Sequence, residues 1–554
     1  MNASRDISPA SNDDPILRAA GQLFGFGSLR PGQREAIDSV LAGTDTLAVL
    51  ATGTGKSAIY ELSGHLLAGP TVVISPLIAL QRDQLAALES RGHVVAVAVN
   101  STETSRQRRE ILDRLAGDGR PDFVFLAPEQ LADGEVLDRL AHLHPVLLAV
   151  DEAHLVSRWG QDFRPDYLRI GPAVEAMGRP IVLALTATAA PAVRTEIVQR
   201  LGMRDPAVRV CDFHRPNIDL AVHSYFTGED HKLEVLGHDV VDAARQRGHG
   251  IVYGATHKRV EELAAAWSDL GLRVRAYHAG LGNAARTEVE HRFHDGELDV
   301  VVATIAFGMG IDKPDIRWVF HADVSGSPDE YYQEVGRAGR DGDRADAVLY
   351  FRSEDLRLPR SYAAKVGPSE ASLTAVADAL AAGGQHRLTL ADLQERVGLS
   401  RSRTEATALA LADVGGVTVE ADGRVTVIGG IEGAATRAAD LVRERRVIER
   451  TRVDSMEAYA EHLGCRWEFL LEYFGEEAAP RCGHCDNDGR ARTAEADVAE
   501  SPFPRGSRVR HHVFGEGVVV GYVGSLILLE FDRVGYKRLD LGLVIDGGLL
   551  QPSD

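Results

Sequence analysis

Short apolar runs alternate with amphipathic segments along the first two thirds of the chain, in two series. The runs of the first series are 47–50, 71–75, 94–97, 123–126, 146–150 and 181–185. Those of the second series are 250–253, 274–278, 300–304, 318–321 and 347–350. Near-continuous apolar runs separated by helical patterns are typical of strands that are buried on both faces of a parallel sheet. The pattern therefore predicts an α/β protein with two parallel-sheet lobes, at 15–211 and 212–352.

The pattern changes after the second lobe. A helix that ends in a turn is indicated at 388–400, a second helix at 402–412 and a hairpin at 417–427. Asp422-Gly423 is a strong two-residue turn signal for that hairpin, and Ser400 or Ser402 can cap the second helix. We interpret 353–436 as a winged-helix-like domain, with a helical spacer as the alternative.

The remaining segments are shorter. We expect a helical subdomain at 437–490 and a linker at 491–504 that contains Ala, Glu and Pro. Short alternating strands with glycine turns at 505–554 predict a small SH3-like or Tudor-like barrel. Residues 1–14 are polar and contain Pro and Ser, and they predict a disordered tail.

Charge narrows the classes of partner. The chain has 61 Lys and Arg against 81 Asp and Glu, a net charge of −20. This balance argues against a protein that coats nucleic acid nonspecifically, but it is compatible with a groove of clustered arginines. Segment 437–452 carries six arginines against three acids, which suits either a phosphate backbone or a solvated helix face.

Localisation is indicated by what the chain lacks. No apolar run approaches the ~20 residues that a membrane span requires, and the N-terminus has no charged-then-apolar leader. We therefore expect a soluble, cytoplasmic protein with no membrane partner.

A phosphate-binding loop is the clearest functional signal. Between the strand at 47–50 and a helix-forming segment stand Thr52-Gly53-Thr54-Gly55-Lys56-Ser57. Glycines allow successive backbone N–H groups to point into one concavity at a helix N-terminus, where an anion binds. Lys56 can then reach the β- and γ-phosphates, and the Ser57 hydroxyl can hold Mg²⁺. Leu50 replaces the first glycine of the usual pattern, and a plain glycine turn is the alternative.

Two carboxylates follow a later strand of the same lobe. The run at 146–150 ends on Asp151-Glu152, and ligands of parallel sheets bind at the carboxyl edge. Asp151 can take Mg²⁺ and Glu152 can polarise the attacking water. A helix N-cap is the alternative for such a carboxylate, but the phosphate loop upstream favours the catalytic interpretation.

The second lobe has no phosphate loop and offers Arg337 and Arg340 instead. Arginines three positions apart share one face of a helix, and an arginine beside a transferring γ-phosphate stabilises the charge that develops there. We infer that ATP binds between the lobes and that hydrolysis moves them. A solvated basic helix face is the alternative.

Upstream of the phosphate loop, Phe26, Arg30 and Gln33 offer a ring, a guanidinium and an amide. Together such groups can stack on a purine and hydrogen-bond to its edge.

Three of the four cysteines lie within 21 positions, at Cys465, Cys482 and Cys485. This spacing suits a metal in a reducing compartment better than a disulfide framework.

The order of these stretches resembles the RecQ family of superfamily 2 DNA helicases, from residue 20 to about 352. The segments that carry the resemblance are 24–33, the phosphate loop, 75–84, 127–129, 151–154, 157–167, 185–189, 212–217, 277–280, 303–314 and 331–342. The resemblance implies two RecA-like lobes that hydrolyse ATP with Mg²⁺, and it accounts for Leu50, because RecQ proteins usually lack that glycine. The implied ATP contacts are Phe26, Arg30, Gln33, Thr52, Gly53, Thr54, Gly55, Lys56, Ser57, Gly308 and Asp312, with Arg337 and Arg340 at the γ-phosphate.

Segment 157–167 is the most diagnostic part of the resemblance. It looks like the aromatic-rich loop that separates RecQ enzymes from RNA-directed DEAH proteins, and aromatic faces stack on bases without reading their sequence. The resemblance implies that this loop senses single-stranded DNA and licenses hydrolysis. The implied DNA-contacting and coupling residues are His154, Ser157, Arg158, Trp159, Phe163 and Arg164.

The segment 465–488 looks like the RecQ zinc subdomain. In most RecQ proteins this subdomain directly follows the second lobe and precedes the winged helix, so the order here is reversed. Asp488 stands where the family has its fourth cysteine. Because carboxylate can ligate tetrahedral zinc, we expect one structural Zn²⁺ on Cys465, Cys482, Cys485 and Asp488. Ligation by His484 and a metal-free relic are the alternatives.

These features together predict an ATP-driven helicase that moves 3′ to 5′ along single-stranded DNA and separates duplexes in repair or recombination. The direction is implied by the resemblance alone. The expected partners are single-stranded and partly duplex DNA, with a protein partner or DNA for the C-terminal barrel. The alternatives are an RNA helicase and a DNA-binding scaffold that acts through the winged helix and the barrel.

Overall fold

The computed structural model describes residues 14–553 except for 26, 52, 77–80, 82–83, 87, 90–93, 101–104, 117–119, 158–164, 212, 226–227, 309–312, 383–386, 421–422, 477–480, 489–502, 505–506, 524–525 and 532–534. The chain divides into two compact units. The first contains the residues up to Ile218, Val222–Glu461 and Leu470–Glu477, and the second contains Asp219–Ala221, His462–Phe469 and the residues from Ala478 onward. Among the helices of the described residues, none is both long and apolar enough to cross a membrane.

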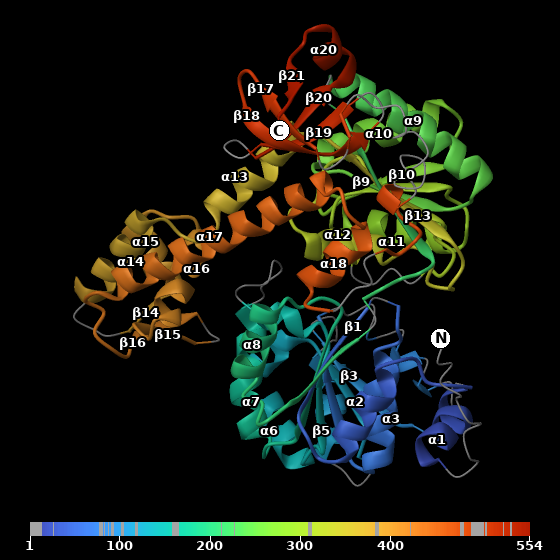
Figure 1. Ribbon diagram of the computed structural model, residues 1–554. Helices are drawn as coiled ribbons and strands as arrows, with labels where there is room; N and C mark the ends of the chain where they lie inside the picture. Colours follow the sequence, from blue (N-terminus) through green and yellow to red (C-terminus); the bar gives the residue numbers. More distant parts are fainter. Residues whose placement is uncertain are drawn as a thin grey trace. The chain divides into compact units, whose positions relative to one another are not determined.

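The first lobe is built on a parallel sheet with the strand order β3-β4-β2-β5-β6-β1-β7. The strands are β1 Thr46–Leu50, β2 Thr71–Ile74, β3 Ala96–Val99, β4 Phe123–Leu126, β5 Leu147–Val150, β6 Ile181–Thr186 and β7 Ala207–Cys211. The helices are α1 Pro15–Phe24, α2 Gln33–Leu41, α3 Ser57–Leu67, α5 Ser105–Ala116, α6 Gly134–Leu143, α7 Ile170–Ala176 and α8 Pro191–Arg200. Helices α1 to α3 lie on one side of the sheet and α6 to α8 on the other (Figure 1).

The strand order of this lobe decides where its chemistry lies. Strands β1, β2 and β5 are buried along their whole length, as their continuous apolar runs predict. Strand β6 lies between β5 and β1. Because parallel strands end at the same edge, the segments that follow β1, β5 and β6 open side by side there.

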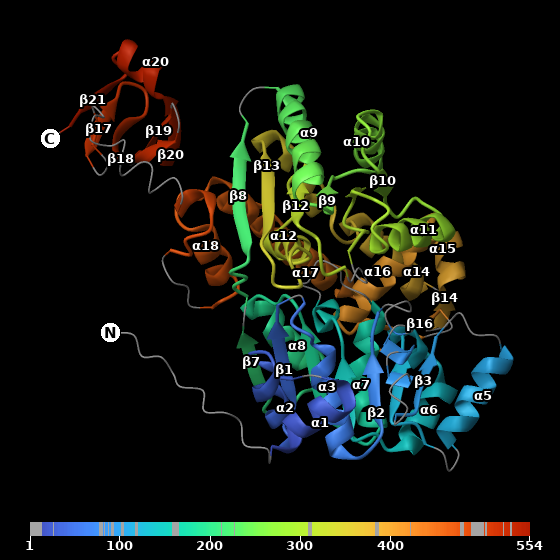
Figure 2. The ribbon, with the colours of Figure 1, turned by 90° about the vertical axis from the view of Figure 1, so that its right-hand side faces the viewer.

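The second lobe has the strand order β10-β11-β9-β12-β13-β8, and β9 to β13 pair in parallel. The strands are β8 Ile218–Ser224, β9 Gly250–Tyr253, β10 Val274–Tyr277, β11 Val300–Ala303, β12 Trp318–His321 and β13 Ala345–Phe351. The helices are α9 Glu229–Gln246, α10 His257–Asp269, α11 Asn283–His294 and α12 Pro328–Val335. Apolar residues of α9 and α10 pack with β9, β11 and β12 in one core, and Figure 2 shows α9 alongside this sheet.

A helical region with a small sheet follows the second lobe. Its elements are α13 Arg357–Lys365, α14 Glu370–Ala382, β14 Arg387–Thr389, α15 Leu390–Val397, α16 Arg401–Asp413, β15 Val417–Val419, β16 Arg424–Val427 and α17 Ala434–Glu461. The antiparallel sheet order is β14-β16-β15. The Ser400 side chain accepts a hydrogen bond from the Arg403 N–H at the start of α16, so Ser400 is the cap. Gly423 has φ 79°, as a tight turn requires, while Asp422 lies outside the described residues.

The arginines of 437–452 lie on α17, and two of them act in packing. Arg446 donates to the carbonyls of Val366 at 2.9 Å and Pro368 at 3.3 Å. Arg452 pairs with Asp329 of α12 at 3.2 Å, and both side chains are about nine-tenths buried (11% and 10% exposed). For these two residues the structure favours packing over contact with a phosphate backbone.

The second unit contains an antiparallel sheet with the order β20-β19-β18-β17-β21. Its elements are β17 Arg508–His511, β18 Gly515–Val523, β19 Leu526–Phe531, β20 Gly535–Asp540, α20 Leu541–Asp546 and β21 Leu550–Pro552. Val509, Val519, Ile527 and Leu529 are fully buried in its small core. These strands form where the sequence predicts short alternating strands.

Candidate active site

The phosphate loop joins β1 to α3 and depends on two glycines. Gly53 and Gly55 have φ 81° and 72°, in the left-handed region that glycine adopts without steric cost. The Lys56 ammonium donates to the carbonyls of Leu50 at 3.3 Å and Ala51 at 3.5 Å, which folds the side chain back over the loop. Burial lowers the pKa of Lys56, and the charges of Glu152 and Asp151 oppose that shift.

Arg30 and Gln33 donate hydrogen bonds to backbone carbonyls of the phosphate loop. The Gln33 amide donates to the carbonyls of Thr54 and Gly55, both at 2.8 Å. The Arg30 guanidinium donates to the carbonyl of Gly53. The sequence predicts these two side chains as purine contacts, and the structure adds a direct role in fixing the loop. Phe26 and Thr52, which belong to the same predicted set, lie outside the described residues.

The acidic pair follows β5. Asp151 is buried (8% exposed), and its Oδ1 accepts the N–H of Glu152 at 3.0 Å. Glu152 has φ 49°, a left-handed conformation that costs a non-glycine residue ~1–2 kcal/mol. Such strain is typical of functional sites.

Neighbouring charges and burial shift the pKa of Asp151. Burial and the Glu152 charge raise the pKa of Asp151, and Lys56 lowers it. Asp151 and Ser57 supply the oxygen donors that Mg²⁺ prefers. A cation held there would favour the ionised carboxylate.

The segment after the acidic pair packs inward against the end of β6. The His154 Nδ1 lies 2.9 Å from the Thr186 hydroxyl, and 3.4 Å from a Glu152 carboxylate oxygen. Ser157 is fully buried and donates to the Glu196 carboxylate at 2.6 Å. Ser157, one of the residues that the resemblance implies for DNA binding or coupling, is thus enclosed against Glu196 of α8.

The arginines of the second lobe occupy different positions. A Cβ added to Gly53 would lie 3.2 Å from the Arg340 Cγ, so Arg340 reaches the phosphate loop of the other lobe. Its charge also contributes to lowering the pKa of Lys56.

Arg337 is buried (6% exposed). The sequence predicts Arg337 and Arg340 on one face of a helix, but α12 ends at Val335 and both arginines lie in the turn that follows it. The Arg337 Nη2 would be 3.2 Å from a Cβ added to Gly308, so a larger residue at 308 would crowd it. Asp312, predicted beside Gly308, lies outside the described residues.

One further contact joins the lobes, and another fixes the start of the second lobe to its own arginine segment; no role was predicted for the residues that make them. The Gln333 amide of α12 donates to the Thr188 hydroxyl of the first lobe at 2.8 Å. Arg215, in the segment between the lobes, donates to the carbonyls of Ala338 at 3.0 Å and Gly339 at 2.8 Å. Gln333 and Thr188 lie in segments that carry the RecQ resemblance, but local pattern does not specify their contact, because the two residues belong to different lobes.

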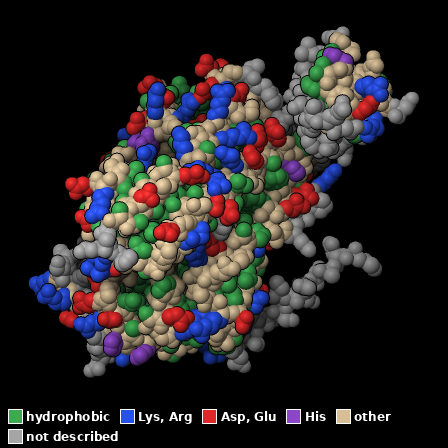
Figure 3. All heavy atoms as spheres, turned by 90° about the vertical axis from the view of Figure 1, so that its left-hand side faces the viewer, with side chains coloured by type: hydrophobic (Ala, Val, Ile, Leu, Met, Phe, Trp, Pro, Cys, Tyr) green, Lys and Arg blue, Asp and Glu red, His purple; other side chains and the backbone are tan. Residues whose placement is uncertain are grey.

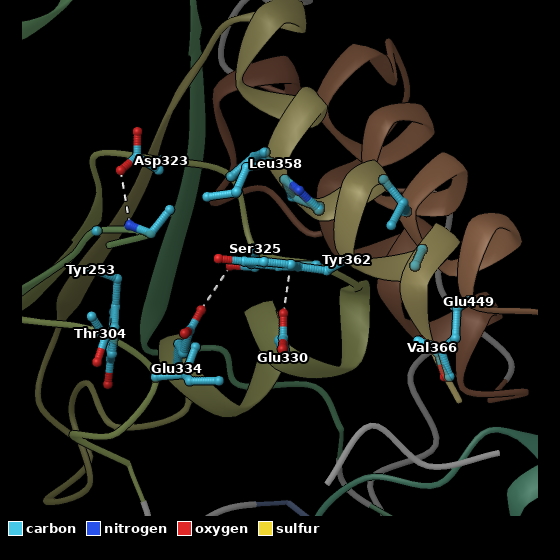
Figure 4. A pocket seen from close by; sticks show the side chains of 18 of the residues that line it. Tyr253, Thr304, Asp323, Ser325, Glu330, Glu334, Leu358, Tyr362, Val366 and Glu449 are labelled. Atoms are coloured by element: carbon cyan, nitrogen blue, oxygen red, sulfur yellow. Dashed lines mark hydrogen bonds between the residues drawn. The ribbon is translucent and has the colours of Figure 1, made fainter. Parts of the chain in front are cut away.

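A cavity of about 260 Å³ lies at the carboxyl edge of the second sheet. Figure 4 shows Tyr253, Thr304, Asp323 and Glu334 on its walls, with Tyr362 across from them. Asp323 accepts the N–H of Ala255 at 2.9 Å. Carboxylates supply much of its polar wall, which disfavours a phosphate group there.

Four potential metal ligands gather in the second unit. Ligand atoms of Cys465, Cys482, Cys485 and Asp488 all lie within 4.8 Å of one another. Sulfur atoms bound to tetrahedral zinc at ≈ 2.3 Å stand roughly 3.8 Å apart, so the cluster fits zinc with little movement. His484 faces Asp219 at 3.7 Å instead, which argues against its service as a ligand.

Three family descriptions match the chain. They are DEAD/DEAH box helicase over residues 30–196, helicase conserved C-terminal domain over 231–342, and RecQ zinc-binding over 434–488. The probable ATP-dependent DNA helicase RecS of Bacillus subtilis is 38% identical over 338 residues, which make up 61% of this chain and 67% of that protein. This chain belongs to the RecQ family.

Other RecQ relatives are matched over a smaller share of their length. The ATP-dependent DNA helicase RecQ of Pasteurella multocida is 38% identical over 60% of this chain and 51% of that protein, so the chain spans about half of it. The solved structure of the helicase MrfA bound to DNA and AMPPNP is 18% identical, with a TM-score of 0.53 over 63% of this chain and 52% of that one. That likeness supports the two-lobe fold alone.

Membership of the RecQ family confirms the resemblance and the helicase fold class that the sequence predicts. The RecQ zinc-binding match and the cysteine cluster support a structural zinc. The predicted DNA-sensing residues Arg158, Trp159, Phe163 and Arg164 lie outside the described residues.

The described surface of the RecQ chain is mixed in charge on the face that Figure 3 presents. Acidic and basic side chains are interspersed there. The net charge of −20 is therefore not concentrated in one acidic patch on that face.

Proposed function

We propose that this chain is an ATP-dependent DNA helicase of the RecQ type. One observation carries the proposal: Arg340 of the second lobe reaches the phosphate loop of the first lobe, with a Cβ added to Gly53 lying 3.2 Å from its Cγ. A site that two lobes complete together changes when nucleotide binds or leaves, which is how hydrolysis can drive movement.

The roles of the residues follow from their positions. Loop N–H groups and Lys56 bind the phosphates, and Asp151 with Ser57 would hold Mg²⁺, which would neutralise phosphate charge when bound. Glu152 orients and polarises the attacking water, and Arg340 stabilises charge at the γ-phosphate. Gly308 leaves room for the Arg337 guanidinium beside it.

DNA is the proposed nucleic acid along which the protein moves. The names of the RecQ and RecS relatives support DNA as substrate, and family resemblance supports 3′ to 5′ movement on a single strand during repair or recombination. We propose the cytoplasm as the place where the protein acts. We also propose that the small β domain at 505–554 binds a protein partner or DNA.

The proposed function is tested by ATP hydrolysis with no nucleic acid, with single-stranded DNA and with RNA of the same length. We expect strong stimulation by DNA, and strand separation of duplexes that carry a 3′ overhang but not of those with a 5′ overhang. Stronger stimulation by RNA would indicate an RNA helicase. DNA binding without stimulated hydrolysis or strand separation would indicate a scaffold.

We propose that Asp488 completes a Cys₃Asp zinc site. Its Oδ2 already accepts the N–H of Gly483 at 2.8 Å, which orients the carboxylate beside the cysteines. We expect Asp488→Ala protein to lose most of its zinc to a chelator, while Asp488→Cys protein keeps it, since metal affinity resides in the complete ligand set. Zinc per chain is measured by elemental analysis after dialysis. Equal zinc retention by Asp488→Ala and unmodified protein would remove Asp488 from the site.

A further inference from the structure

The segment Tyr473–Glu476 begins at the last residue of α18 (Arg466–Tyr473). It contacts both lobes and the segment 213–217 at the start of the second lobe. The Tyr473 hydroxyl donates to the Asp329 carboxylate of α12 at 2.6 Å. The Phe474 ring stacks on the Phe213 ring, with centroids 4.6 Å apart and planes 4° apart. Both rings are fully buried. This segment is therefore part of the junction between the lobes.

Segment 213–217 is hydrogen-bonded to the rest of the second lobe. The Tyr332 hydroxyl of α12 donates to the carbonyl of Phe213 at 2.8 Å, and the Asn217 amide donates to the carbonyls of Gly339 at 2.8 Å and Asp343 at 2.9 Å. The Glu476 carboxylate accepts the N–H of Phe213 at 3.2 Å. Segment 213–217, segment 473–476 and α12 are thus connected into one block.

The first lobe reaches this block through Arg194 of α8. The Arg194 Nε donates to the carbonyl of Ala189 at 2.8 Å, and its Nη2 donates to the carbonyl of Phe474. Burial lowers the pKa of Arg194, and the nearby Glu476 charge partly offsets that shift. One guanidinium thereby bridges two backbone carbonyls that lie 285 positions apart (474 − 189).

Ala189 belongs to the segment that touches the catalytic side of the first lobe. The Thr186 hydroxyl lies 2.9 Å from His154 Nδ1 and donates to the Thr188 carbonyl at 2.9 Å. Gln333 of α12 reaches the Thr188 hydroxyl at 2.8 Å. If the block of 213–217, 473–476 and α12 rotates relative to α8, either the two Arg194 hydrogen bonds lengthen or segment 186–189 moves with the block.

We propose that Arg194 is a positioning residue that transmits lobe movement to segment 186–189 through Phe474. The proposal rests on the proposed helicase function, since it assigns the step that couples hydrolysis to movement. In the described contacts, Arg194 touches neither the phosphate loop nor the acidic pair. Its proposed effect is therefore on the coupling of ATP hydrolysis to strand separation, and not on hydrolysis itself. A guanidinium suits this role because its planar fork can donate to two fixed carbonyls at once.

The coupling is measured as base pairs separated per ATP hydrolysed. We expect Arg194→Ala to lower this ratio by about 3- to 30-fold, the range for residues that carry coupling, with basal hydrolysis and the KM for ATP unchanged. Arg194→Lys keeps the charge but not the planar fork, so it should recover the ratio only in part. Arg204→Ala is the control, because Arg204 is exposed and pairs with the exposed Glu175 at 3.2 Å.

Two results would overturn the proposal. An unchanged ratio in Arg194→Ala would show that the bridge carries no coupling. A parallel fall of basal hydrolysis, stimulated hydrolysis and thermal unfolding midpoint would show that Arg194 only stabilises the fold.

A second measurement does not depend on strand separation. Hydrogen exchange of 186–190 and 473–476 is followed with and without a non-hydrolysable ATP analogue. In unmodified protein we expect both segments to respond, and in Arg194→Ala only segment 473–476, because the bridge that carries the movement to 186–190 is missing. If only one of the two segments changed its exchange on nucleotide binding in unmodified protein, the proposal would be overturned. If neither segment changed, the result would count against the proposed function itself.

Discussion

Replacing Lys56 with alanine is expected to lower kcat for ATP hydrolysis by ~10³-fold, comparable to or beyond the loss of a preorganised charge-stabilising donor. The Lys56 ammonium is held over the phosphate loop by the carbonyls of Leu50 and Ala51, and it provides the positive charge on the loop nearest the acidic pair. Without it, the loop itself offers only its N–H groups to the phosphate charge. Hydrolysis is measured at saturating single-stranded DNA.

The control for Lys56→Ala is Arg106→Ala. Arg106 lies on α5 of the same lobe, its side chain is 89% exposed and it pairs only with Glu110 in the described contacts. We expect DNA binding to persist in Lys56→Ala, because the loop is not part of the predicted DNA surface. Retained hydrolysis in Lys56→Ala protein would mean that the loop is a structural turn and not the catalytic phosphate site.

Replacing Arg340 with alanine is expected to lower kcat by ~10³-fold or more, as loss of an arginine at the γ-phosphate does in other nucleotide hydrolases. Arg340 reaches Gly53 across the lobes, so it meets the phosphate only when the lobes are together. An interaction made chiefly in the transition state lowers kcat and kcat/KM equally, so the KM for ATP should stay unchanged. Steady-state hydrolysis over a range of ATP concentrations measures both quantities.

Arg344→Ala is the matched control for Arg340→Ala. Arg344 follows four positions later and its side chain is exposed. A rise in KM with unchanged kcat in Arg340→Ala would contradict the assigned role, because it would show uniform binding of ground and transition states. Equal losses in Arg344→Ala would attribute the effect to general loss of positive charge.

The elements of the lobes were predictable because local periodicity reports burial. Strands β1, β2 and β5 are continuous apolar runs and are buried throughout, and only a parallel sheet covered on both faces accommodates such runs. The phosphate loop and Asp151-Glu152 were predictable for the same reason, since each directly follows such a strand. Ser400 capping α16 is likewise a local event.

Partners that lie far apart in the sequence were not predictable. Gln33 was predicted as a purine contact and also fixes the phosphate loop. Ser157 was predicted among the DNA-binding and coupling residues, and its partner is Glu196 of α8. Arg452 stood in a basic run, yet its partner is Asp329, 123 positions away. In each case the residue type was informative, but the choice of partner depended on how separate elements pack.

The sequence by itself determined the parallel sheets, the phosphate loop, the acidic pair and the three clustered cysteines, because spacing along one or two neighbouring segments is enough to specify them. Only the tertiary structure decided that Arg340 approaches Gly53 of the loop while Arg337 is buried beside Gly308. It also decided that Arg194 bridges Ala189 and Phe474. The physical reason is that a hydrogen bond or close approach requires atoms within a few ångströms, and that distance is set by packing between lobes rather than by the pattern within either one.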